Sequence, residues 1–271
     1  MILDAKSLIK YFRSLGLDVH TSTKARGHQG FYMNKRIDIS KNIPEERVVP
    51  TLVHEFTHYI HAQIEPFMEK TGGSLEVIFD DTDDINRYKK ELIKVTNFVD
   101  NHSKCEKLKT HKLIIKDHIV ECERIIKKKY PKFLRSKKFK DFDKYIKKSK
   151  AKYLLKYDRV KLISGMFFKK VEIFSIDNIE KDFTDMPKEF AAYIRLRSYQ
   201  KKQARVSARI NKLNKYYNKP SELFARFVEG LYLNSKIVQN IAPYTYKRFF
   251  YLLACGYYKE LEYVVESFID Q

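Results

Sequence analysis

The five residues His54-Glu55-Phe56-Thr57-His58 constrain this chain more than any other stretch. Positions i and i+4 of an α-helix lie on one face, so His54 and His58 can both direct an imidazole nitrogen to one metal ion. Glu55 directly follows the first histidine. Its carboxylate would therefore lie beside the metal, where it can take a proton from an attacking water. The spacing predicts the catalytic helix of a zinc hydrolase.

The sequence before the motif predicts a small sheet that leads into an apolar helix. Residues 31–33 and 36–40 resemble the two strands of a hairpin, because the second segment alternates apolar and polar side chains. A helix is expected to open at Pro44. It continues through apolar residues at three- and four-residue spacing, namely Val48, Val49, Leu52, Val53 and Phe56.

A hydrolytic zinc site needs a third protein ligand in addition to the two histidines. In the metzincin pattern a glycine lies three residues after the second histidine and another histidine lies six residues after it. These positions hold His61 and Ile64, which excludes that class. Glu189 and Glu222 each lie in the first turn of a predicted helix, behind a proline and three residues before an alanine. Both are candidates for the third ligand.

The segment around Glu222 carries a resemblance to a known family. Residues 222–229, Glu-Leu-Phe-Ala-Arg-Phe-Val-Glu, resemble the Glu-Leu-Phe-Ala-Arg-x-x-Glu signature of zincin-like metallopeptidase domains. These domains occur in large phage and mobile-element proteins and are related to the minigluzincins. Residues 30–55 are similar to the strand-then-helix region of ImmA/IrrE-like peptidases. The resemblance implies that Glu222 is the third Zn²⁺ ligand and that the chain is a gluzincin-type endopeptidase acting on a protein or peptide.

Two further residues near the motifs could support the site. His61 shares a helix face with His58, and Arg226 lies one turn after Glu222. Each is interpreted either as a group that supports the ligands or stabilises an oxyanion, or as a purely structural residue. The tyrosines considered as oxyanion donors, without a preference among them, are Tyr216, Tyr217, Tyr244 and Tyr246.

A second metal site is considered in the middle of the chain. The spacing of its cysteines and histidines resembles that of a zinc finger. The residues are His102, Cys105, His118 and Cys122. Their order is scrambled and the segment between them reads as one helix. A helix face with a buried free cysteine is therefore the favoured interpretation.

The charge of the chain predicts an acidic partner. Its 54 Lys and Arg residues exceed its 34 Asp and Glu residues, which gives a formal net charge of +20. The segment from Glu123 to Lys170 contains 19 basic and 4 acidic residues, interleaved with aromatic residues. This segment could contact nucleic acid or an acidic protein, although aromatic residues at such spacing also form the cores of solvated helices. One alternative function is therefore a nucleic-acid-associated protein with a structural or vestigial metal site. Another is a toxin or effector peptidase with one dedicated target.

Composition also bears on the compartment. Three cysteines do not describe a disulfide framework, which favours a reducing compartment and a cytoplasmic protein. The first residues resemble an amphipathic helix and not a signal peptide. No run of apolar residues is long enough to span a bilayer, so no membrane insertion is expected.

The expected fold class is α-dominated α+β. A small antiparallel sheet should pack on the His54–His58 helix. We expect residues 1–64 to form this first part, residues 65–180 a Lys-rich and mainly helical insertion, and residues 181–271 a helical part that carries the third ligand. Residues 36–40 are the expected edge strand, to which a peptide substrate would add.

Overall fold

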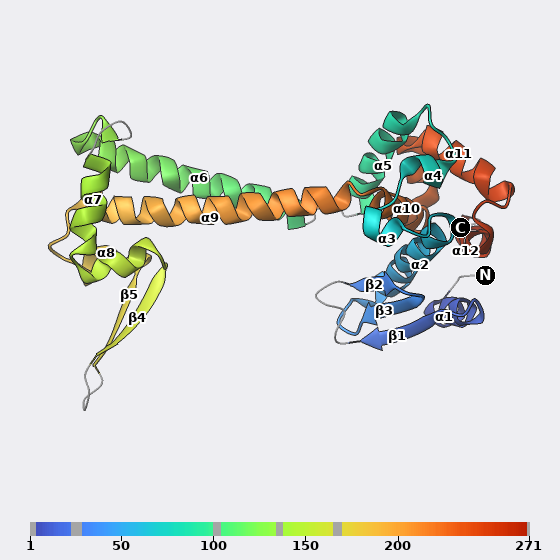
Figure 1. Ribbon diagram of the computed structural model, residues 1–271, viewed down its shortest axis with the longest axis horizontal. Helices are drawn as coiled ribbons and strands as arrows, with labels where there is room; N and C mark the ends of the chain where they lie inside the picture. The colour runs from blue at the N-terminus through green and yellow to red at the C-terminus, as the bar shows by residue number, and fades with distance from the viewer. Residues whose placement is uncertain (1–3, 23–28, 100–103, 134–137, 165–169, 270–271) are drawn as a thin grey trace. The chain divides into compact units, whose positions relative to one another are not determined.

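The computed structural model describes residues 4–22, 29–99, 104–133, 138–164 and 170–269. The chain forms two compact units (Figure 1). The first unit contains Met1–Ser103 together with Asn214–Gln271, and the second contains Lys104–Leu213. These bounds differ from the expected insertion at 65–180, because residues 65–99 belong to the first unit and residues 181–213 to the second. The fold is α-dominated α+β, as predicted.

The first unit is built mainly of helices around one hydrophobic core. Its elements up to residue 103 are α1 (Ala5–Ser14), β1 (Asp18–Ser22), β2 (Gly30–Met33), β3 (Arg36–Ser40), the 3₁₀ helix η1 (Glu45–Arg47), α2 (Val48–Ile64), α3 (Met68–Thr71), α4 (Leu75–Phe79) and α5 (Ile85–Val99). After the second unit follow α10 (Pro220–Ile241), α11 (Pro243–Ala254) and α12 (Lys259–Ile269). Within the described residues, no helix combines the length and apolarity needed to cross a bilayer.

The sheet of the first unit is small and mixed. Strand β2 pairs with β3 in antiparallel register, as predicted, whereas β1 pairs with the other side of β3 in parallel register. Strand β3 is therefore central, and the expectation that residues 36–40 form an edge strand is wrong. Among the described strands, β2 is the edge strand that packs on α2, the helix of the histidine motif.

Helices α2 and α10 form the centre of the first unit. Helix α2 is apolar on most of its surface and buries Leu52, Val53 and Phe56 completely. Helix α10 packs against both α2 and α5. Pro220 occupies its first turn, where a missing backbone N–H costs nothing. The first turn of α10 thus lies against the helix that carries His54 and His58.

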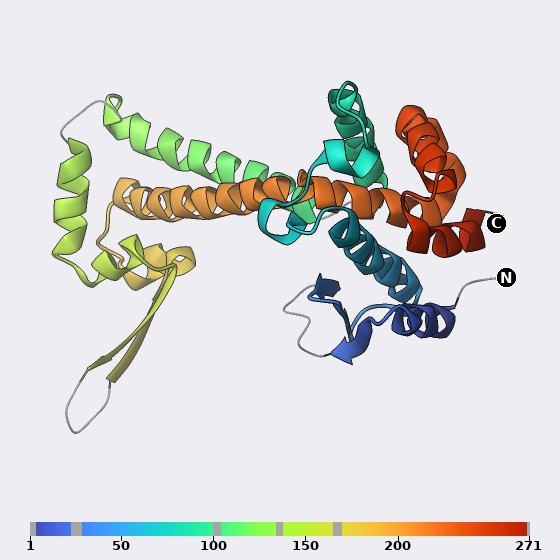
Figure 2. The ribbon, with the colours of Figure 1, turned by 45° about the vertical axis from the view of Figure 1, so that its right-hand side comes forward.

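The second unit has a separate core. Its elements are α6 (Lys104–Lys129), α7 (Lys138–Lys147), the 3₁₀ helix η3 (Lys150–Leu155), β4 (Arg159–Ser164), β5 (Lys170–Ser175), the 3₁₀ helix η4 (Ile176–Asn178), α8 (Ile179–Asp182) and α9 (Lys188–Tyr217), of which residues after Leu213 belong to the first unit. Helices α6 and α9 run side by side, and β4 and β5 form an antiparallel hairpin (Figure 2).

Candidate metal centre

The structure brings His54, His58 and Glu222 together. One ligand atom from each of the three side chains lies within 4.8 Å of the other two. The Nε2 atom of His54 is 3.6 Å from Oε2 of Glu222, and Nε2 of His58 is 3.5 Å from Oε1. The histidines come from consecutive turns of α2, and the glutamate comes from the first turn of α10. Among the described residues, this is the group whose geometry could hold a metal ion.

The Glu222 carboxylate fits a metal ligand better than a structural ion pair. Its side chain is 9% exposed, and no hydrogen-bond partner for the buried Oε2 atom is found in the described part of the chain. A buried carboxylate oxygen without a hydrogen bond is costly, and a bound cation would remove that cost. Two imidazoles and one carboxylate are also the ligand set that catalytic Zn²⁺ sites use.

Glu229 holds the ring of His54 in place. Its Oε2 accepts a hydrogen bond of 3.0 Å from Nδ1 of His54, because a carboxylate can only accept. This bond leaves the lone pair of the ring on Nε2, which faces Glu222. Glu229 is 1% exposed and is paired in turn with Arg47 at 2.7 Å and with Arg226 at 3.0 Å. The two arginines therefore hold the Glu229 carboxylate in place, and Glu229 holds the ring of His54 on the side opposite Nε2.

The charges at the site favour a bound cation. Burial alone would lower the pKa of His54, but Glu222 and Glu229 together raise it to about 9. Burial lowers the pKa of His58 to about 3, so this imidazole is neutral and can coordinate. Burial opposes ionisation of Glu222, yet His58 and His54 lower its pKa to about 2. The raised pKa of His54 indicates that Glu222 and Glu229 stabilise positive charge at this position.

Glu55 is buried next to the ligands and against the edge strand. Burial raises the pKa of Glu55 to about 7, with His54 acting in the opposite direction. A β-carbon added at Gly30 of β2 would lie 2.8 Å from Cγ2 of Thr51 and 3.0 Å from both Cγ and Oε1 of Glu55. Only glycine fits there, because the backbone of β2 approaches α2 so closely. The candidate base thus lies between the metal ligands and the edge strand.

Tyr216 lies beside Glu222, just before α10. Burial and the neighbouring carboxylate of Glu222 raise the pKa of the Tyr216 phenol far above its usual range. The hydroxyl in turn helps to lower the pKa of Glu222. Of the four tyrosines considered from the sequence, Tyr216 thus lies next to the candidate ligand Glu222, and its raised pKa keeps the phenol protonated.

His61 does not contact the ligands but joins the segments that carry them. Its ring is fully buried, and Nε2 is 3.0 Å from Oε2 of Glu65, which also accepts a hydrogen bond from the backbone N–H of Ser74. Gly73 has a φ of +79°, and a β-carbon there would lie 2.2 Å from Cε1 of His61. The preceding carbonyl, of Gly72, accepts a hydrogen bond from the N–H of Ser221, directly before Glu222. The loop therefore links the end of α2 to the start of α10.

The other predicted site residues have different partners. Arg226 donates to Glu229, so its contribution to the site passes through that carboxylate. Glu189 pairs with Lys129 at 3.6 Å in the second unit and does not belong to the His-His-Glu group. His102 and the side chain of Cys105 lie outside the described residues, so the zinc-finger-like spacing is only partly visible. Its second half shows His118 stacked on Tyr199 and Cys122 as a buried free thiol.

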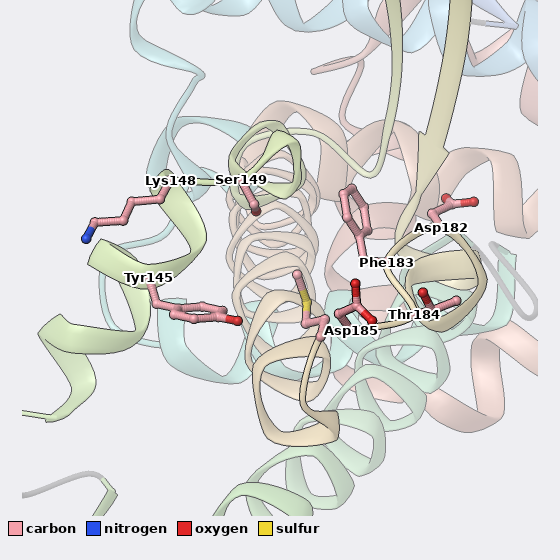
Figure 3. A pocket seen from close by; sticks show the side chains of 8 residues that line it. Tyr145, Lys148, Ser149, Asp182, Phe183, Thr184 and Asp185 are labelled. Atoms are coloured by element: carbon pink, nitrogen blue, oxygen red, sulfur yellow. The ribbon is translucent and has the colours of Figure 1, made fainter.

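A separate cavity of about 430 Å³ lies in the second unit (Figure 3). Tyr145, Phe183 and Met186 contribute apolar side chains to its lining, and Asp182 and Asp185 contribute carboxylates. Neither histidine nor cysteine lines it, and it contains none of the His-His-Glu group. The metal cluster and not this cavity is therefore the candidate catalytic site.

The chain matches no family model, no curated protein and no solved structure. The chemistry of the site therefore has to be argued from its own residues.

Proposed function

We propose that this chain is a zinc-dependent metallopeptidase of the gluzincin type, which hydrolyses peptide bonds of a protein or peptide substrate. The observation that carries the proposal is the convergence of His54 and His58 on α2 with Glu222 on α10, more than 160 residues later in sequence. The buried carboxylate of Glu55 lies beside them. A purely structural zinc site is closed by four protein ligands and needs no base. Three ligands and an adjacent carboxylate favour hydrolysis.

Each residue of the site has its own role in the proposed reaction. His54, His58 and Glu222 would hold Zn²⁺, which when bound polarises the scissile carbonyl and lowers the pKa of the attacking water. Glu55 takes a proton from that water and passes it to the leaving amine. Tyr216 can donate a hydrogen bond to the carbonyl oxygen as negative charge develops on it. Strand β2 is the edge to which an extended substrate backbone would add, next to Glu55.

Removal of the metal tests the proposal. The protein is loaded with Zn²⁺ and incubated with peptides from a denatured protein, and new amino termini are identified by mass spectrometry. Treatment with a chelator should abolish cleavage, and added Zn²⁺ should restore it, because water activation needs the metal. A His54→Ala/His58→Ala double variant serves as the control for contaminating peptidases. Cleavage that survives the chelator, or that the double variant retains in full, would contradict the proposal.

Glu229 is expected to determine zinc affinity without being a ligand. The Glu229→Ala variant should bind Zn²⁺ about 10- to 100-fold more weakly, because the ring of His54 loses its hydrogen bond. Its free energy of unfolding should fall by about 3–5 kcal/mol, because Arg47 and Arg226 lose a buried partner. Competition with a chromophoric chelator and urea unfolding measure the two effects. Glu266→Ala, at an exposed position of α12, is the matched control, and equal zinc affinity in the two variants would refute the role.

A further inference from the structure

The second unit carries the whole net charge of the chain. Residues 104–213 contain 33 Lys and Arg residues against 13 Asp and Glu residues, whereas the rest of the chain contains 21 of each kind. The first unit, which holds the metal cluster, is therefore electrically neutral overall. A charge of this size in one unit concentrates acidic molecules around it and repels basic ones. The chemistry expected of its partner is negative charge.

The β4–β5 hairpin offers the open edges of a sheet. The two strands pair with each other and form a sheet of their own among the described strands. Figures 1 and 2 both show the hairpin projecting from the helices of the second unit. The N–H of Ser175, at the end of β5, already donates to Asp182. The remaining outer edge of each strand presents backbone N–H and C=O groups that an added strand can bind.

The outward face of the hairpin carries three exposed aliphatic side chains. Residues opposite each other in an antiparallel pair share a face, and the register places Ile163 opposite Val171 and Lys161 opposite Ile173. The side chains of Ile163, Val171 and Ile173 are 59%, 49% and 49% exposed. Val160 and Phe174 lie on the opposite face and pack against the second core. Three large aliphatic side chains thus project together into solvent, which is typical of an interaction surface.

The outward face is also positively charged. Arg159 and Lys161 are exposed on it, and neither forms an ion pair in the described part of the chain. Glu172 is the one carboxylate within the described residues of β4 and β5, and it lies opposite Leu162 on the other face. There it pairs with Lys150 at 2.5 Å and with Lys170 at 3.3 Å. The aliphatic surface is therefore bordered by cations that no carboxylate of the hairpin neutralises.

We propose that the β4–β5 hairpin binds an extended acidic segment of a protein partner by strand addition. The backbone of the segment would pair with an open edge of the hairpin, and its carboxylates would meet Arg159 and Lys161. Its alternate apolar side chains would cover Ile163, Val171 and Ile173. Surfaces that bind single-stranded nucleic acid use aromatic rings to stack on bases. The large apolar side chains on the outward face of β4 and β5 are aliphatic instead. The inference does not depend on the metal centre.

The test uses the full chain with Glu55→Gln, so that no probe is cleaved. The probe is a fluorescent nine-residue peptide in which glutamate alternates with valine and threonine, followed by fluorescence anisotropy. It should bind at low salt, and its affinity should fall as NaCl screens the charges. Lys161→Glu should weaken binding about tenfold, because attraction becomes repulsion. Lys116→Glu, which reverses an exposed charge on α6, is the matched control and should leave the affinity unchanged.

Two further probes decide between modes of binding. The same peptide with alternate backbone nitrogens methylated should bind at least about tenfold more weakly, because it cannot donate the hydrogen bonds of an added strand. A labelled oligothymidylate should bind the Glu55→Gln chain, which is the parent in this test, no more tightly than it binds the same chain with Lys161→Glu. The proposal is overturned by a parent chain that does not bind the acidic peptide, or by equal weakening in Lys161→Glu and Lys116→Glu. It is equally overturned by undiminished binding of the methylated peptide, or by an oligonucleotide that binds more tightly than the peptide and depends on Lys161. Circular dichroism confirms that each variant is folded.

Discussion

The Glu55→Gln variant is expected to retain Zn²⁺ and to lose at least about a hundredfold of kcat/KM for peptide hydrolysis. Glutamine has nearly the same shape as glutamate and fits the space between α2 and Gly30. Its amide cannot accept the proton of the attacking water, so the ligands stay in place while the base is lost. Metal analysis and cleavage of a peptide identified with the parent protein measure the two properties.

The matched control for this variant is Glu46→Gln. Glu46 is an exposed carboxylate in the short helix η1 that leads into α2, so its loss changes the charge of the same segment without touching the site. The control should keep both zinc and activity. Full activity of Glu55→Gln would remove the general-base mechanism, and loss of zinc in that variant would show that Glu55 serves the metal instead.

The Glu222→Ala variant should lose zinc, whereas Glu189→Ala should keep it. Glu222 completes a group whose ligand atoms lie within 4.8 Å, while Glu189 pairs with Lys129 in the second unit. Loss of a partner that only orients a ligand weakens metal binding by about 10- to 100-fold, so loss of a direct ligand should cost more than about a hundredfold. Zinc content per chain and chelator competition measure this difference. Zinc retained by both variants would refute the ligand assignment, and circular dichroism excludes unfolding as the cause of a loss.

The residues of the metal cluster could be predicted because helix geometry limits where they can lie. His54 and His58 are four residues apart, so any helix that contains them places them on one face. Glu222 follows a proline that opens a helix, which made it one of two candidates. The local helix pattern could not choose between Glu189 and Glu222, because both occupy it, and only the resemblance of residues 222–229 favoured Glu222. Tertiary packing distinguishes them, since α10 lies against α2.

The residues that contact the candidate ligands were harder to predict from the sequence. Glu229 was noticed only as the end of the Glu-Leu-Phe-Ala-Arg-x-x-Glu segment, although its position seven residues after Glu222, on the same helix face, could have suggested a second carboxylate at the site. Tyr216 could not be singled out among 19 tyrosines. Its place follows from the close succession of α9, whose last turn contains Tyr216, and α10, whose first turn contains Glu222.

The order of the strands in the sheet could not be predicted from the local sequence pattern either. The alternation in residues 36–40 predicts a strand, but it does not say how many partners the strand has. The pairing of β1 with β3 is parallel and joins residues separated by a whole strand and two connections. A parallel pair between distant segments has no turn signature to reveal it, unlike the hairpin of β4 and β5. The edge position was therefore assigned to β3, whereas the edges of this sheet are β1 and β2.

The separation of His58 from Glu222 has a consequence for synthesis of the protein. The entire second unit is translated between the two halves of the metal cluster. A nascent chain therefore contains both histidines and Glu55 long before it contains Glu222, and the proposed hydrolysis could begin only after α10 has left the ribosome. A metal ion bound there would also crosslink the chain across a very long loop. Because the entropy of closing a loop rises only with the logarithm of its length, even an insertion of this size adds little to that cost.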